Sequence, residues 1–206
     1  MAETERPQIY LITPPAFSLD SFPDRLAAVL DAVETACIRL ALASQDEGEL
    51  GRAADALREV AHARDIALVI EKHQLLVERH GLDGIHLTDG ARSVRKARKA
   101  LGDDAIVGTF CGGSRHDGMT AGEMGADYVA FGPVGASPLG DGSQAPDELF
   151  AWWSEMIEVP VVAEGALTVE RVAALAPITD FFAIGEEIWA AEDAAQALKE
   201  LLAPLG

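Results

Sequence analysis

Charged, histidine and cysteine side chains follow several short apolar runs of this sequence, and these are the residue types that can do chemistry. The run ALVIE ends in Glu71 and is followed by Lys72 and His73, GIHLT contains His86, and AIVGTF ends just before Cys111. Carboxylates and imidazoles exchange protons, and a lysine ammonium holds an anion. The pattern predicts a polar site built from the ends of these runs.

Each of these residues also has a structural explanation that the sequence leaves open. Glu71, Lys72 and His73 are ordinary residues for a strand end followed by the start of a helix. His86 either orients a substrate or binds a metal, or it is buried and satisfied by the backbone. Cys111 is a nucleophile only beside a base, and His116, five positions on, is better explained as the start of a helix.

The stretch DFFAIGEEIW (180–189) places Glu186 and Glu187 directly after Gly185, where a helix is expected to begin. Helix N-termini present unsatisfied N–H groups and partial positive charge, so they bind phosphate readily. Two carboxylates there either close a phosphate site or simply gain about 0.3–1 kcal/mol each from the helix dipole. Both interpretations stay open.

Short apolar runs alternate with helical patterns along the chain, and these elements must position the candidates. The runs lie at 8–14, 37–42, 67–71, 84–88, 105–110, 128–132, 159–165 and 180–185, and the helical patterns at 24–36, 48–64, 91–101, 117–125, 146–157, 168–176 and 190–202. Most runs are apolar on both faces, as in a parallel sheet covered by helices. Eight such units in 206 residues predict a single (β/α)₈ TIM barrel domain over 1–206 rather than an open doubly wound sheet.

In such a barrel the strand ends meet at one mouth, where active sites lie. The long loop GPVGASPLGDGSQAP (132–146) follows the sixth strand and is expected to cover that mouth as a lid. Most of the polar residues expected there are carboxylates, and Lys72 is the main base. The carboxylates are Glu71, Asp89, Asp141, Glu164, Glu186 and Glu187. A negative cavity suits a small cationic or polar neutral ligand.

The charge balance excludes several classes of partner. The chain has 34 acidic against 16 Lys and Arg residues, a formal net charge of −18, which disfavours nucleic acid and anionic membranes. The single basic segment, Arg92, Arg95, Lys96, Arg98 and Lys99, is expected to be a solvated helix face or a place for a partner's acidic surface. The two cysteines, a polar N-terminus and apolar runs shorter than the roughly 20 residues of a membrane span predict a cytoplasmic protein. Homo-oligomerisation stays open.

Three segments carry a family resemblance. GLDGIHLTDG (81–90) resembles the GADGVHLGQED segment of thiamine phosphate synthases, GADYVAFGPV (125–134) is similar to their sixth strand, and VPVVAEGALT (159–168) resembles their PVVAIGGIT phosphate loop. On these segments, in register along nearly the whole chain, the protein is identified as a member of the thiamine phosphate synthase and thiazole tautomerase superfamily. The resemblance implies a (β/α)₈ barrel.

The resemblance also implies a chemistry. The synthases join an aminopyrimidine diphosphate to a thiazole phosphate; pyrophosphate leaves first and the thiazole nitrogen captures the pyrimidine cation. Mg²⁺ and basic side chains are expected to hold the leaving group, because charge develops on its oxygens. Backbone N–H groups after strands seven and eight are expected to hold the thiazole phosphate.

The motif positions depart from the family in a concerted way. The two metal-binding aspartates correspond to Lys72 and Ala91, so no metal ligand is predicted. The QLRxK motif has Arg39 for its glutamine and alanines at 41 and 43 for its two bases. The lysine of the long loop has no counterpart.

The phosphate loop is kept in part. It retains Gly165, has Ala166 for the second glycine, and is preceded by Glu164, while the family's phosphate-binding serine corresponds to Glu186. The tautomerase histidine corresponds to Pro133, which has no acid–base chemistry.

Two functions follow as hypotheses. The first is a thiamine phosphate synthase with Mg²⁺, in which Lys72 and His86 are the catalytic candidates. The second is a binding or regulatory paralogue whose acidic mouth accepts a cationic or aminopyrimidine small molecule such as thiamine. The ligand-binding candidates for both are Arg39, Glu71, His73, Cys111, Glu164, Gly165, Ala166, Gly185 and Glu186. The resemblance favours the first hypothesis, and the residue chemistry favours the second.

Overall fold

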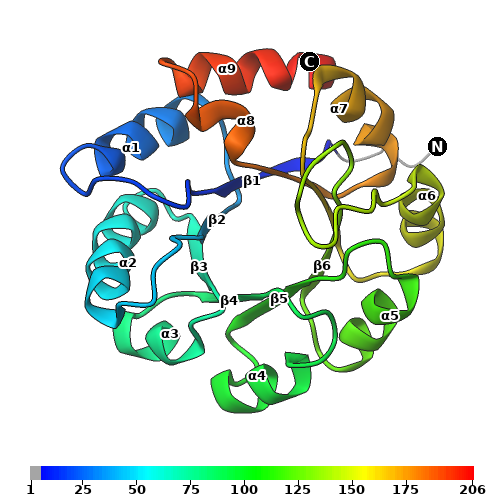
Figure 1. Cartoon of the computed structure of the whole chain (residues 1–206), viewed down its shortest axis with the longest axis horizontal. Helices are drawn as coiled ribbons and strands as arrows, with labels where there is room; N and C mark the ends of the chain where they lie inside the picture. Colours follow the sequence, from blue (N-terminus) through cyan, green and yellow to red (C-terminus); the bar gives the residue numbers. More distant parts are fainter. Residues whose placement is uncertain (1–5) are drawn as a thin grey trace.

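Eight parallel strands close on themselves in the computed structural model, which describes residues 6–206 (Figure 1). The strands are β1 (Gln8–Ile12), β2 (Cys37–Leu40), β3 (Ala67–Glu71), β4 (Gly84–Leu87), β5 (Ile106–Phe110), β6 (Tyr128–Phe131), β7 (Val161–Glu164) and β8 (Phe181–Ile184). Closure is direct, since Gln8 of β1 pairs with Phe181 of β8. The (β/α)₈ barrel is confirmed, and each strand lies within its predicted run.

Helices surround the barrel as a ring (Figure 1). They are α1 (Phe22–Ala32), α2 (Glu47–His62), α3 (Gln74–His80), α4 (Val94–Leu101), α5 (Arg115–Glu123), α6 (Asp147–Met156), α7 (Val169–Leu175), α8 (Glu186–Trp189) and α9 (Ala194–Leu201), with short 3₁₀ turns at Ala176–Ile178 and Ala203–Leu205. The helical patterns missed the seven-residue α3. The pattern at 190–202 begins too early, because the Asp193 carboxylate caps α9 by accepting from Gln196 N–H.

The loop between β6 and α6 crosses the end of the barrel (Figure 1). Trp153 of α6, the helix that follows this loop, packs its ring against Phe131 of β6, and its Nε1 donates to the Val159 carbonyl before β7 at 2.7 Å. Gly118 of α5 makes this packing possible, because a Cβ there would lie 2.7 Å from Phe131 and 2.8 Å from Trp153. The helix after the loop is therefore packed against β6, the strand before it.

Polar side chains fill part of the barrel interior, where aliphatic layers are usual. The Tyr128 ring occupies space that Gly108 leaves open, because a Cβ on Gly108 would lie 1.9 Å from the tyrosine Cζ. The Tyr10 and Tyr128 hydroxyls are 2.7 Å apart, and both residues are buried. This interior polar cluster forms the floor beneath the mouth.

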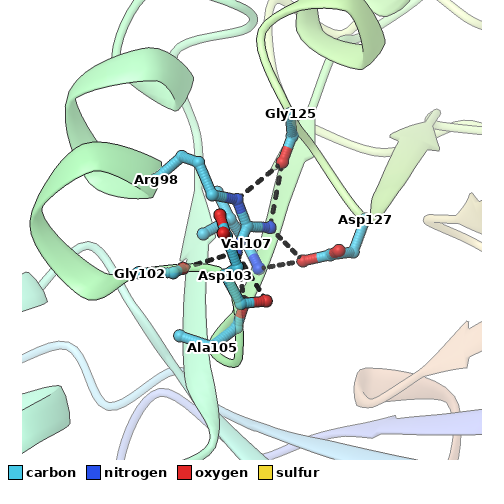
Figure 2. A network of polar contacts seen from close by, with 7 residues as sticks. All are labelled: Arg98, Gly102, Asp103, Ala105, Val107, Gly125 and Asp127. Atoms are coloured by element: carbon cyan, nitrogen blue, oxygen red, sulfur yellow. Dashed lines mark hydrogen bonds and ion pairs between the residues drawn. The ribbon is translucent and has the colours of Figure 1, made fainter.

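Arg98 departs from the predicted solvated basic face of α4. Its guanidinium donates to the carbonyls of Gly125, Gly102 and Ala105 at 2.6–3.0 Å and pairs with the Asp127 carboxylate (Figure 2). The side chain thus joins the end of α4 to the turn before β6. Helical periodicity alone cannot show this, because the carbonyl acceptors come from loops.

Candidate ligand-binding site at the barrel mouth

A buried ion pair joins opposite sides of the mouth. Arg39 of β2 is 2% exposed, and its Nη2 donates to Glu164 Oε2 of β7 at 2.8 Å. Its Nη1 lies 3.6 Å from Glu71 Oε2 of β3. Burial by itself would lower the pKa of Arg39, but the Glu164 charge and hydrogen bond, together with Tyr10 and Tyr128, raise the pKa above its ordinary value. The guanidinium therefore remains a cation between two carboxylates.

The turn after β3 holds a strained residue. Lys72 has φ of +69°, which costs a non-glycine residue on the order of 1 kcal/mol. His73 N–H donates to the Glu71 carbonyl at 2.9 Å across it, the pattern of a γ-turn. The Lys72 ammonium lies 3.3 Å from Glu71 Oε1 and the side chain is largely exposed. The turn thus holds this cation at the rim of the mouth.

Glu187 occupies the backbone donors of the phosphate corner. Its Oε2 accepts from Gly185 N–H at 2.8 Å and its Oε1 accepts from Leu167 N–H at 3.1 Å. One carboxylate thereby bridges the loops after β7 and β8, the two loops expected to hold phosphate. Glu186, the residue predicted for this place, is instead exposed. The paired glutamates after Gly185 were the signal, but the sequence does not show which of them turns inward.

His86 belongs to the interior cluster rather than to the mouth. Its Nδ1 lies 2.8 Å from the Tyr128 hydroxyl, and its Nε2 has no hydrogen-bond partner among residues 6–206. Burial, then the charges of Arg39 and Lys72, hold its pKa well below the ordinary value, so the imidazole is neutral. Burial also raises the pKa values of Tyr10 and Tyr128. The sequence reasoning missed both tyrosines, because an aromatic residue in a strand usually signals packing.

This burial predicts an acid-sensitive fold. Below about pH 6.5 the unfolded chain protonates His86 while the folded chain does not, so stability falls as pH drops through that value, by up to about 1.4 kcal/mol per pH unit. Urea unfolding of wild type and His86→Gln between about pH 5 and 7 measures the difference in slope. Equal slopes in the two proteins would contradict a neutral buried imidazole.

Cys111 does not have the environment of a nucleophile. The thiol is 5% exposed, and burial, then the charges of Asp117 and Asp89, raise its pKa to about 12. His116 lies exposed on α5. A thiol with so high a pKa stays protonated near neutral pH, and only thiolates attack.

The mouth contains a cavity of about 530 Å³. Most of the predicted ligand-binding residues line it: Arg39, Glu71, Lys72, His73, Glu164, Gly165, Ala166, Gly185 and Glu186, whereas His86 and Cys111 do not. Ser137, Pro138 and Leu139 of the long loop cover one side, and Leu139 packs onto the interior cluster. The open part therefore lies over β1–β3 and β7–β8.

The residues present do not suit Mg²⁺, which prefers carboxylate, carbonyl and water oxygens. The two family metal positions hold the Lys72 cation and the buried Ala91 methyl group. The nearby Asp89 carboxylate accepts from Ser93 Oγ at 2.5 Å. Within residues 6–206, no group of three or more His, Cys, Asp or Glu could hold a metal ion.

Comparisons with known proteins agree with the barrel and with the resemblance of the motifs. The family model described as thiamine monophosphate synthase matches residues 9–188. The chain belongs to the thiamine monophosphate synthase family. The predicted resemblance is thus confirmed at the level of the family.

The relatives cover this member of the family almost end to end. It is 43% identical to a thiamine-phosphate synthase of Rhodospirillum centenum, with 88% of this chain and 89% of the relative covered. It is 39% identical to one of Erythrobacter litoralis, with 98% and 99% covered. A solved thiamine phosphate pyrophosphorylase of Pyrococcus furiosus superposes with a TM-score of 0.82 at 21% identity. The superposition covers 98% of this chain and 96% of that one, and it supports the fold. None of the described helices is both long and apolar enough to span a membrane.

Proposed function

We propose that this chain binds a small cationic or aminopyrimidine ligand of thiamine metabolism in its mouth and does not carry the Mg²⁺-dependent release of pyrophosphate. The observation that carries the proposal is the Glu187 carboxylate, which occupies the Gly185 and Leu167 N–H groups. A phosphate at this corner would need those donors and would meet a like charge instead. At 4 Å that repulsion is about 1 kcal/mol even in water, and more where water is excluded.

The charges around the cavity support the same ligand class. The lining holds four carboxylates, Glu71, Glu164, Glu186 and Glu187, against the two cations Arg39 and Lys72. Both cations face carboxylates already, Arg39 at 2.8 Å and Lys72 at 3.3 Å. The remaining negative charge favours a cationic ring and disfavours a phosphate inside the mouth.

Thermal-shift measurements test the proposal. Thiamine is expected to raise the melting temperature, because a ligand that binds only the folded state stabilises it. Thiazole phosphate is expected to raise it little. Stabilisation by pyrophosphate that requires Mg²⁺ would contradict the proposal.

Glu187→Ser is expected to open the phosphate corner. The substitution frees two N–H donors and removes one negative charge that repels phosphate, so the affinity for thiazole phosphate should rise about tenfold. Calorimetric titration measures this affinity. Glu186→Ser is the matched control, because it removes the same charge from the neighbouring residue without freeing the two donors. Equal gains in the two variants would show that net charge, and not the occupied donors, excludes phosphate.

Thiamine phosphate synthase activity is the second candidate, favoured by the 43% identity to a relative with that name. In that case Lys72 would hold the leaving group in place of the missing bases. An assay of pyrophosphate release from the aminopyrimidine diphosphate and thiazole phosphate decides between the two. Turnover at an ordinary enzymatic rate would overturn the binding proposal.

The cytoplasmic location remains a proposal. It is supported by the two buried cysteines, Cys37 and Cys111, which are free thiols.

A further inference from the structure

A second cavity adjoins the mouth on the side of β3 and α4. It has a volume of about 360 Å³ and its lining includes Lys72, His73, Leu75, Ser93 and Lys96. Lys72 and His73 also line the mouth cavity. The two cavities therefore meet at these side chains, and we call the second one the α4 groove.

Positive charge is concentrated beside the α4 groove. Four exposed bases form a basic stripe here: Arg92 lies in the turn before α4, and Arg95, Lys96 and Lys99 lie on the helix itself. None of the four has a carboxylate within 4.0 Å among the described residues, whereas arginines on other elements do, such as Arg64 with Asp31. Arg95 and Lys99 are like charges four positions apart on α4, and such a pair destabilises a helix. The stripe is therefore an uncompensated positive surface on an acidic chain.

The one carboxylate lining the α4 groove is already engaged. Glu47 of α2 lies 3.0 Å from Arg79 Nη1 of α3. Its charge is thus countered from outside the groove. Lys96 remains available to an anion, and Lys72 reaches the same space from the strained turn after β3.

We propose that the α4 groove binds the phosphate end of a ligand whose cationic ring enters the mouth. The inference rests on the proposed function for the ring and on the α4 groove for the phosphate. A phosphate monoester or diphosphate with a positively charged heteroaromatic ring has both ends. The acidic mouth and the basic groove would orient it by opposite charges, with Lys72 and His73 between them.

Calorimetric titrations at low ionic strength test the proposal with three probes and no added Mg²⁺: thiamine, thiamine phosphate and inorganic pyrophosphate. Thiamine phosphate is expected to bind about fivefold more tightly than thiamine, since a surface cation–phosphate contact contributes on this scale. Lys96→Ala should abolish the difference and weaken pyrophosphate binding. Lys199→Ala, which removes an exposed lysine on α9, should change neither.

Three outcomes would overturn the inference: thiamine phosphate binding no more tightly than thiamine, wild type failing to bind pyrophosphate, or equal losses in Lys96→Ala and Lys199→Ala. A different result would contradict the proposed function alone and leave the inference about the α4 groove standing. If thiamine does not bind while pyrophosphate binding depends on Lys96, the mouth proposal is wrong and the α4 groove is supported as the phosphate site.

Discussion

Glu164→Ala is expected to lower the free energy of unfolding by about 3–5 kcal/mol, because it leaves the Arg39 cation buried without its main partner. Arg39 is 2% exposed and Glu164 is 5% exposed, so the guanidinium depends on this carboxylate more than on water. Glu71 remains, but its oxygen lies 3.6 Å from Arg39 and compensates weakly. Urea unfolding with an unchanged m-value measures the loss.

Two variants separate a broken pair from general damage at the mouth. Glu71→Ala should cost less, because its carboxylate is partly exposed and more distant from the guanidinium. The double variant Arg39→Met/Glu164→Leu should recover much of the stability, since an apolar pair of similar volume removes the uncompensated charge. A double variant less stable than Glu164→Ala would show that the pair is needed for packing rather than for charge balance.

Arg98→Ala is expected to lower the free energy of unfolding by about 3 kcal/mol, since hydrogen bonds to a charged group contribute about 1.5–3 kcal/mol each and several are lost together. The side chain serves the Gly102, Ala105 and Gly125 carbonyls and the Asp127 carboxylate (Figure 2). Asp127 in turn accepts from Val107 N–H of β5 at 2.7 Å. Loss of Arg98 therefore loosens the β5–β6 junction.

The neighbouring Lys99 supplies the control for Arg98. Lys99→Ala removes the same charge from an exposed position of the same helix and should change stability by less than about 0.5 kcal/mol. Thermal and urea unfolding of both variants give the comparison. Similar losses would assign the effect to helix propensity and charge instead of to the network.

The barrel could be predicted from the sequence because its signals are local. Runs such as ALVIE and YVAFG are apolar on both faces, as expected in a parallel sheet covered by helices, and they alternate with helical patterns. The run 67–71 matches β3 in full, and 128–132 exceeds β6 by one residue. The short α3 escaped because its apolar residues, Leu75, Leu76 and Val77, are consecutive and show no helical spacing.

The candidate site could be predicted in part. Residue types at a strand end pointed to Glu71 and Lys72, and the family resemblance pointed to Arg39; all three line the mouth cavity. Cys111 follows its strand in the same way, yet it lies buried away from that cavity. Whether a residue after a strand faces the mouth or the helices depends on a loop path that pattern alone does not define.

The sequence by itself determined the closed barrel, the family and the departures at the metal and phosphate positions, because each depends on residue identity along the chain. Only the tertiary structure decided that Glu187 and not Glu186 takes the phosphate donors, and that Arg98 leaves its basic stripe to bind carbonyls. It also decided that the Arg39 cation is paired with Glu164, 125 residues away. These outcomes depend on distances between side chains and backbone groups of different elements, and such distances exist only once the chain has closed on itself.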